Sequence, residues 1–211
     1  MESTGIQRLF YIIWAIVKLN LYILVFTLAG AVVLGAGPAF QSANDILVES
    51  GMDYQKITFS GMWERFKSNF KRGNILFWIY AVVFFVLGYN LYLASQIKGL
   101  LWFVLSFVLA FAVILLMVIY LYVVQYETVY DISIGNLIKL AFISVFLNFG
   151  TFLKVLFGLA SILVVTWFFK GLLLVATFSL FLVWSGYATK DIRQIVDGKL
   201  ENDDTKAEKN L

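Results

Sequence analysis

Long apolar stretches alternate with short polar segments along most of the chain. Three of the stretches lack any charged residue; they hold 26 residues between Lys18 and Asp45, 25 between Arg72 and Lys98, and 28 between Lys98 and Glu127. A helix needs about 20 apolar residues to cross the hydrocarbon core of a bilayer, which is roughly 30 Å thick. The pattern therefore predicts transmembrane helices over residues 9–34, 75–93 and 100–124.

The C-terminal half has shorter apolar runs. They hold 14, 15 and 19 uncharged residues and are divided by Lys139, Lys154, Lys170 and Lys190. A run of 14 residues is too short to span a bilayer unless a lysine extends its charge back to the headgroups. We therefore predict a tilted amphipathic helix over 134–149, followed by spans over 152–169 and 172–187. This makes five spans, and full insertion of 137–149 would make six.

The segment 60–72 has the pattern of a helix that lies in the headgroup layer. Its aromatic residues recur at helical spacing, and its basic residues fall on the other side of the helix. The apolar face has Trp63, Phe66 and Phe70, and the basic face has Arg65, Lys67, Lys71 and Arg72. Such a helix can rest on the membrane as a connector. The alternative is a docking surface for a partner protein, which these seven residues would form.

The stretch "GAGPAFQSAND" follows the first apolar run and holds the single proline of the chain. Gly35 and Gly37 allow backbone angles that end a helix, and Pro38 suits the first position of a new one. Phe40 and the apolar residues after it then recur at helical spacing, so 38–49 is predicted to be a short amphipathic helix along the membrane face. The helix start beside Gly35, Gly37 and Pro38 is a candidate anion site, and a structural junction is the alternative.

Composition identifies lipid as the solvent of this pattern. Apolar residues make up 62% of the chain and charged residues 14%, with a mean hydropathy of +0.89, whereas soluble domains are roughly 45–50% apolar and about 25% charged. The predicted fold is an all-α integral membrane protein over 1–198, a bundle of about five transmembrane helices with interfacial amphipathic helices. The polar tail 199–211 has no aromatic residue and is predicted to be disordered.

The chemistry that the chain can perform is limited by its composition. It contains no cysteine and no histidine, which removes the usual ligands of zinc, iron–sulfur and haem sites and the imidazole base of most nucleophilic enzymes. It also lacks a P-loop signature, and none of the predicted spans contains an aspartate. We therefore expect no catalytic residues, no metal and no cofactor. The net charge of +3, with basic residues beside apolar segments, favours lipid headgroups over nucleic acid as a partner.

The distribution of lysine and arginine predicts an orientation in the cell membrane. With five spans, the loop 41–73, the segment 127–150 and the tail share one side and hold most of the basic residues, whereas Arg8, Lys98 and Lys170 face the other side. The basic side is expected to be cytoplasmic. The C-terminus would then lie inside the cell and the N-terminus outside.

Polar residues inside the first predicted span are functional candidates, because polar side chains are costly in lipid. Lys18 and Asn20 are two residues apart, and therefore point about 200° apart on a helix. We expect Lys18 to extend towards the headgroups and Asn20 to hydrogen-bond another helix.

A second group of candidates lies at the end of the third predicted span. Gln125 and Glu127 are followed by Asp131, which would share a helix face with Glu127 if the helix continued. The two carboxylates could pair with a lysine at 139 or 154, hold a cation or take part in acid–base chemistry. An ion-paired helix end at the interface is the simpler alternative.

Several of these segments resemble one known family. A first span with "KLNLYIL" that closes on "GAGPAFQSA", followed by the Phe-rich basic segment "MWERFKSNFKRGNILFW", is similar to the N-terminal part of the YesL family of bacterial membrane proteins. The later "NLIKLAFISVFLNFGTFLKVL" and "FSLFLVWSGYATKDI" are similar to the family's asparagine-bearing helix and final span, so the resemblance covers about residues 5–195. The family often has a threonine where this chain has the small residues before Gly37.

The resemblance implies a role but no biochemical activity. Members of the family are often encoded beside carbohydrate ABC uptake systems and glycan-degrading enzymes, which implies a non-catalytic accessory protein that associates with ABC permease subunits. The alternative is a small-solute transporter or channel that acts alone or as a homo-oligomer. Lys18, Asn20, Asn90, Gln125 and Glu127 would then line a polar route.

Overall fold

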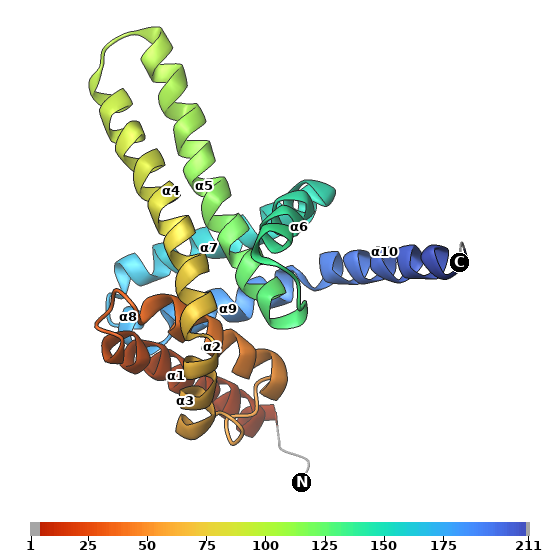
Figure 1. The fold of residues 1–211 in the computed structure, drawn as a ribbon. Coiled ribbons are helices and arrows are strands. Elements are labelled where there is room, and N and C mark those ends of the chain that lie inside the picture. Colours follow the sequence, from red (N-terminus) through yellow and green to blue (C-terminus); the bar gives the residue numbers. More distant parts are fainter. Residues whose placement is uncertain (1–4, 210–211) are drawn as a thin grey trace.

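The computed structural model describes residues 5–209, with side chains to residue 199, and all regular elements of this part are helices (Figure 1). Their bounds are α1 Gly5–Ala29, α2 Ala36–Ser50, α3 Phe59–Ser68, α4 Phe70–Gln96, α5 Leu100–Val129, α6 Ile134–Leu147, α7 Phe149–Phe168, α8 Leu172–Val175, α9 Thr177–Ala188 and α10 Lys190–Lys209. Helices α4 and α5 form a long hairpin that projects away from the other elements.

Four helices are long and apolar enough to cross a membrane, namely α1, α4, α5 and α7. Each overlaps one of the predicted spans, and their mean hydropathies over the best windows are between 1.9 and 3.0. Large apolar side chains are exposed along all four, as expected of helices whose surroundings are lipid. The prediction of an all-α membrane protein is confirmed, and the chain is a multi-pass membrane protein.

The predicted fifth span is not one continuous helix. The chain forms the single turn α8, leaves helical geometry at Ala176 (φ −148°) and begins again as α9. At 1.5 Å per residue the 12 residues of α9 cover roughly 18 Å, which is less than the roughly 30 Å that a span requires. The spacing of the charged residues shows how long this apolar segment is, but it does not show the break at Ala176.

The first helix ends earlier than predicted, because the chain turns back over residues 30–35. Ala31 and Val32 have positive φ values of 53° and 66°. A Cβ on Gly35 would lie 2.3 Å from the carbonyl oxygen of Thr27, so this turn requires a glycine. Helix α2 then begins at Ala36, which makes Pro38 its third residue rather than its first. A proline is still tolerated there, because the first turn needs no N–H donor.

Helix α2 lies at the centre of the molecule instead of along its surface as predicted. It contacts α1, α3, α4, α5 and α9, and eight of its residues are buried. Gly37 permits the close approach of α4, since a Cβ there would lie 2.5 Å from the carbonyl oxygen of Gly73. The apolar periodicity of 38–49 correctly predicted a helix. It could not show that the polar residues of the other face are also buried.

The predicted amphipathic helix over 60–72 is divided at Asn69. Helix α3 ends at Ser68, and Phe70 to Arg72 already belong to α4. The amphipathic helix predicted over 134–149 corresponds to α6, which ends at Leu147 because the side chain of Asn148 accepts a hydrogen bond from the backbone N–H of Thr151 and caps α7. Helix α6 has 14 residues and is one of the shorter apolar helices.

Parts of the three segments that were predicted to share one side are in contact. Arg72 donates to the backbone carbonyl of Ile132, and Tyr130 donates to Asp197 Oδ1 over 2.6 Å. Helix α10, which contains Asp197, continues to Lys209 and so differs from the disorder predicted after residue 198. Its lysine, glutamate and alanine residues favour helix. Residues 210 and 211 lie outside the described part.

The N-terminal half of α1 also lies beside the loop between α2 and α3. The ring of Tyr54 stacks on Tyr11 with 5.0 Å between centroids, and Lys18 Nζ donates to the carbonyl oxygen of Tyr54 over 3.1 Å. The orientation prediction placed the N-terminus and the loop 41–73 on opposite sides. The structure differs because α2 folds back along α1.

Candidate functional site

The main concentration of buried polar side chains lies where α2 packs against α5 and α9. We define the polar cluster as the residues of this group that hydrogen-bond one another, which are Gln41, Ser42, Asn44, Asp45, Asn69, Gln125, Thr128 and Ser185. Most of them are fully or almost fully buried. Buried polar groups are costly unless they are paired, so the partners of each decide what the cluster does.

Helix α2 is joined to α5 through Thr128. Gln41 Nε2 and Asn44 Nδ2 donate to Thr128 Oγ1 over 2.9 and 2.7 Å, and both also approach the carbonyl oxygen of Val124. The Thr128 hydroxyl donates to Asp45 Oδ1 over 2.6 Å. Gln41, Asn44 and Asp45 are spaced i, i+3 and i+4, which places them on one face of α2. That face is therefore fixed against the C-terminal end of α5.

Gln125 extends the same network to α9. Its Nε2 donates to Asn44 Oδ1 over 2.8 Å and to Ser185 Oγ over 2.9 Å. On the other side of the cluster, Asn69 Nδ2 donates to Asp45 Oδ2 and to Ser42 Oγ. The break between α3 and α4 thus supplies a donor to the central carboxylate. Four elements meet in one network of hydrogen bonds.

An ion pair lies beside the polar cluster. Arg72 at the start of α4 pairs with Glu127 near the end of α5, and the distance from Arg72 Nη2 to Glu127 Oε2 is 2.9 Å. The side chain of Glu127 is 8% exposed and that of Arg72 is 34% exposed. A buried carboxylate in lipid surroundings needs such a partner. Arg72 provides it, whereas the sequence had suggested a lysine from 139 or 154.

Asn20 fills the break between α8 and α9. Its Oδ1 accepts hydrogen bonds from the backbone N–H groups of Phe178 and Ser179 over 2.9 and 3.2 Å, and its Nδ2 donates to the carbonyl oxygen of Leu173. The side chain is fully buried. Asn20 therefore satisfies the first free N–H groups of α9, as an N-cap residue does, but its side chain comes from α1. The expectation that Asn20 bonds another helix is met.

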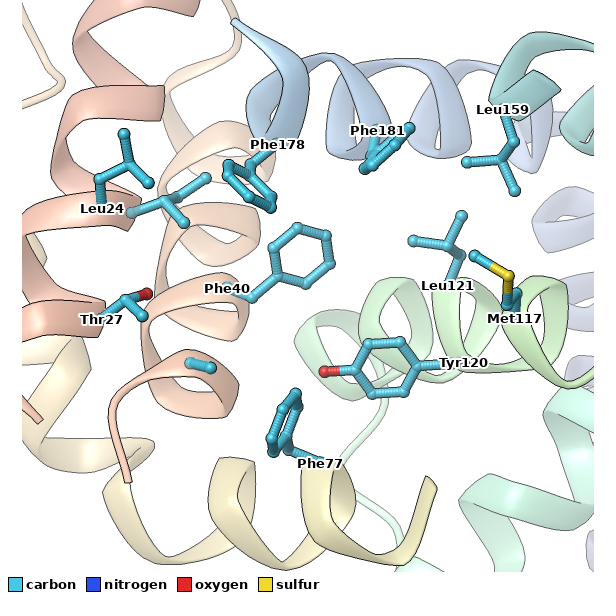
Figure 2. A pocket seen from close by; sticks show the side chains of 12 residues that line it. Leu24, Thr27, Phe40, Phe77, Met117, Tyr120, Leu121, Leu159, Phe178 and Phe181 are labelled. Carbon is cyan, nitrogen blue, oxygen red and sulfur yellow. The ribbon is translucent and has the colours of Figure 1, made fainter. Parts of the chain in front are cut away.

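A cavity of about 370 Å³ adjoins the cluster, one helical turn earlier on α5 (Figure 2). It lies between α1, α2, α4, α5, α7 and α9. Ten of its twelve lining residues have hydrocarbon or thioether side chains, and the other two, Thr27 and Tyr120, carry hydroxyls. Figure 2 shows the Tyr120 hydroxyl pointing into the space that Phe40 and Phe77 border. The cavity is thus suited to an apolar occupant.

The arrangement is suited to holding helices together. Asp45 accepts from Asn69, Thr128 and Gln41, and Glu127 pairs with Arg72. In the part of the chain that the structure describes, no group of three Asp or Glu residues is placed to bind a metal ion. Polar pairs between membrane helices stabilise their association, and the cluster supplies several of them at one end of the bundle.

The remaining predicted site residues are dispersed. Lys18 reaches the loop at Tyr54. Asp131 lies beyond the end of α5 and is exposed, so it shares no helix face with Glu127. Gly37 and Pro38 are buried where α2 packs against α4 near Gly73, so Gly37 serves a close helix contact. The anion site at Gly35, Gly37 and Pro38 stays a prediction.

The predicted docking face is divided among several contacts. Phe66 is buried against Phe26 of α1, and Trp63 and Phe70 are partly exposed. Arg65 pairs with Glu49, and Lys67 lies over the ring of Trp63 with 5.4 Å to its centroid. Lys71 is exposed, and Arg72 turns inward to Glu127. The seven residues do not form one continuous face, because the helix breaks at Asn69.

The residues that α2 contributes to the polar cluster were not predicted from the sequence. Gln41, Asn44 and Asp45 were not among the predicted candidates, and neither was Thr128 of α5. A signal was present, since the three α2 residues lie on one face at spacing i, i+3 and i+4 beside small residues. The interpretation of this helix as a surface element placed that face in water, where polar residues need no partner.

A family model described as "Protein of unknown function, DUF624" matches residues 16–91. The match extends from α1 to α4 and includes the α2 half of the polar cluster. No curated protein and no solved structure matches the chain. Residues 16–91 are thus similar to a domain of unknown function, within an all-helical, multi-pass membrane protein.

Proposed function

We propose that the protein is a non-catalytic accessory membrane protein of the YesL family that associates with the permease subunits of a bacterial carbohydrate ABC uptake system. The observation that carries the proposal is the α4–α5 hairpin. It projects beyond the other helices (Figure 1) and exposes large apolar side chains on both of its helices. A hairpin of this length can present a membrane-embedded surface to the helices of another protein.

The use of the polar residues supports an accessory role over transport. The residues that would have lined a polar route are engaged elsewhere: Asn20 bonds α8 and α9, Gln125 bonds Asn44 and Ser185, and Glu127 pairs with Arg72. Asn90 donates to the carbonyl of Val86 in its own helix. A transporter needs polar groups that face a passage, so transport remains the weaker alternative.

The link to carbohydrate uptake rests on the family resemblance. The match to a domain of unknown function over residues 16–91 supports that resemblance, and the resemblance implies the ABC system. We place the protein in the plasma membrane with the C-terminal tail in the cytoplasm. Hydrogen bonds from Arg72 to Ile132 and from Tyr130 to Asp197 join three segments that hold many of the basic residues, and this supports the placement.

The proposal is tested by affinity purification from the native bacterium. The tagged protein is extracted in a mild detergent, and the recovered proteins are identified by mass spectrometry. We expect the permease subunits of a carbohydrate ABC system. Repeated recovery of the tagged protein without any transporter subunit would contradict the proposal.

A matched pair of variants tests the role of the hairpin. Phe103 and Phe107 on α5 meet edge to face with 4.8 Å between ring centroids, and they are 61% and 62% exposed. Replacing both by alanine is expected to lower permease recovery. The control replaces Phe157 and Phe168 of α7, which are 74% and 76% exposed, and should leave recovery unchanged. Equal recovery in both variants would remove the hairpin from the proposed interface.

A further inference from the structure

We infer that the apolar cavity of Figure 2 is a binding site for a single-chain lipid, a long-chain fatty acid or fatty alcohol, whose oxygen-bearing end meets the hydroxyl of Tyr120. The inference does not depend on the accessory role, because it concerns the apolar space between the helices and not the exposed hairpin residues Phe103 and Phe107. It is drawn from the size and the lining of the cavity and from the orientation of the Tyr120 hydroxyl.

The size of the cavity fits a chain. Its volume is about 370 Å³. A methylene group is close in size to a water molecule, which takes up roughly 30 Å³ of liquid volume, so the cavity can hold on the order of ten methylene groups. A second cavity of about 600 Å³ shares Phe77, Met117 and Tyr120 with the first and extends along the hairpin past Phe84. A longer chain can therefore continue from the first space into the second.

The lining selects apolar chemistry. Leu24, Phe40, Phe178 and Phe181 point into the space from three helices (Figure 2). Water between such walls would have few hydrogen-bond partners, and apolar cavities in proteins bind apolar molecules. Among the described residues that line it, none is charged. A phosphate inside would therefore be unpaired in a region of low dielectric, which favours a single-chain lipid over a phospholipid.

The hydroxyl of Tyr120 sets the position of the polar end. It points into the cavity (Figure 2). In lipid surroundings a hydroxyl that has no partner is costly, and a carboxylic acid or alcohol can both donate to it and accept from it. An alkane of the same length cannot. The site should therefore distinguish an oxygen-bearing chain from a pure hydrocarbon.

Access to the cavity is through the lipid-facing side. Met117 lines both cavities and is 39% exposed, so it stands where the space opens. Phe77 borders the same two cavities from α4. A chain that diffuses in the bilayer can therefore reach the first cavity along the groove that α4 and α5 line, without crossing water.

The test uses the full-length protein in phosphatidylcholine vesicles with a photoactivatable palmitic acid. After illumination, the labelled residues are located by mass spectrometry of peptides. We expect labels on the segments of α2, α5 and α9 that line the cavity, and we expect unlabelled palmitic acid to suppress them more strongly than hexadecane does. Labels that are confined to outward-facing side chains would overturn the inference. So would cavity labelling that only a photoactivatable phosphatidylcholine produces.

Two variants make the test specific. Leu24→Trp fills the cavity from α1 and should abolish the cavity labels, whereas Leu21→Trp, on the exposed side of the same helix (45% exposed), should leave them intact. Tyr120→Phe keeps the shape and removes the hydroxyl, so competition by palmitic acid should weaken by about two- to tenfold, the equivalent of one hydrogen bond. The control is Tyr92→Phe on the hairpin surface, where Tyr92 is 62% exposed.

The outcome must also separate loss of the site from loss of the fold. Each variant is compared with the wild type by gel filtration and by its thermal unfolding midpoint in detergent. If Leu24→Trp elutes and unfolds as the wild type does and still shows the cavity labels, the inference is wrong. If Tyr120→Phe competes as well as the wild type, the assignment of the polar end is wrong. Neither result bears on recovery of ABC permease subunits.

Discussion

The region around α2 and the outer part of the α4–α5 hairpin use polar side chains in opposite ways. Around α2, side chains from distant parts of the chain bond one another: Gln125 reaches Asn44 and Ser185, and Asn20 reaches Phe178. In the hairpin, Asn90 and Gln96 donate to carbonyl oxygens one turn earlier in their own helix. The first pattern fixes helices relative to one another, and the second satisfies a side chain without joining anything.

The difference indicates where the fold of a lipid-exposed chain is specified. Membrane helices gain little from apolar contact with each other, because lipid tails are equally apolar. Close packing at small residues and hydrogen bonds between helices must then determine the arrangement. Both are concentrated around α2, at Gly37 and in the polar cluster. The outer hairpin is held mainly by contact between its two helices, and its outward apolar side chains are exposed.

The largest effect is expected from adding a methyl group at the centre. Gly37→Ala would place its Cβ 2.5 Å from the carbonyl oxygen of Gly73, and because a backbone atom cannot turn aside, α2 and α4 must separate. We expect a loss of about 3 kcal/mol in the free energy of unfolding. The hairpin control is Gly88→Ala, where no atom lies within 4 Å; it should be neutral or stabilise by up to about 1 kcal/mol. Unfolding by sodium dodecyl sulfate in mixed micelles measures both, and equal losses would contradict the comparison.

A smaller effect is expected when the cluster loses its link to α9. Gln125→Leu removes the donor to Asn44 and Ser185 and leaves their acceptors buried, which should cost about 2 kcal/mol. Gln96→Leu removes a bond within the hairpin and should change the stability by less than about 0.5 kcal/mol. The same titration measures both variants. An unchanged midpoint for Gln125→Leu would mean that the cluster does not hold α9.

A buried ion pair and an exposed ion pair should also differ in how much they stabilise the fold. A double-mutant cycle of Arg72→Gln with Glu127→Gln is expected to give a coupling energy of about 1–2 kcal/mol, since Glu127 is 8% exposed while Arg72 is partly solvated. The pair of Lys154 and Asp191 is 59% and 63% exposed. Its coupling should be below about 1 kcal/mol and should fall as salt is added. A larger coupling in the exposed pair would reverse the predicted order.

The smallest change in stability is expected from the hydrogen bond that attaches α10 to Tyr130, which lies outside the spans. Burial, with Asp197 accepting its hydrogen bond, raises the pKa of Tyr130 above its ordinary value near 10. The folded state therefore favours the protonated phenol. The stabilisation is fully present below about pH 10 and is lost as the pH rises through the higher pKa of the folded state.

This alkaline loss should be about 1 kcal/mol or less, because the contact is partly exposed. It is measured as the difference between wild type and Tyr130→Phe in the unfolding midpoint, followed from neutral to alkaline pH. The difference should shrink above about pH 10. A difference that stays constant over this range would show that the hydrogen bond from Tyr130 to Asp197 contributes nothing.

The length of the apolar runs was enough to predict the membrane class and the four long helices, because a span is defined by length and hydrophobicity. The break at Ala176 could not be predicted in this way. It depends on Asn20, which lies more than 150 residues away in sequence (|i−j| of 153 to Leu173). The polar character of Asn20 did predict a bond to another helix, but not which backbone groups it would satisfy.

The polar cluster was predicted only in part for a related reason. Gln125 lies inside an apolar helix and is conspicuous there, so it was a candidate. Gln41, Asn44 and Asp45 lie in a helix that is polar enough to belong on a surface. Their burial follows from the turn at 30–35 and from the close contact of Gly37 with Gly73, and both are properties of the folded backbone rather than of the local pattern.

The central claim is that hydrogen bonds between helices around α2, and not those within the hairpin, hold the fold together. Comparing Asn20→Leu with Asn90→Leu tests it most directly, because the same substitution is made in the two regions. Asn20 makes three bonds to the α8–α9 break, so its replacement should lower the free energy of unfolding by about 2–3 kcal/mol. Replacement of Asn90 should change it by less than about 0.5 kcal/mol. Equal losses from the two substitutions, or a larger loss from Asn90→Leu, would contradict the claim.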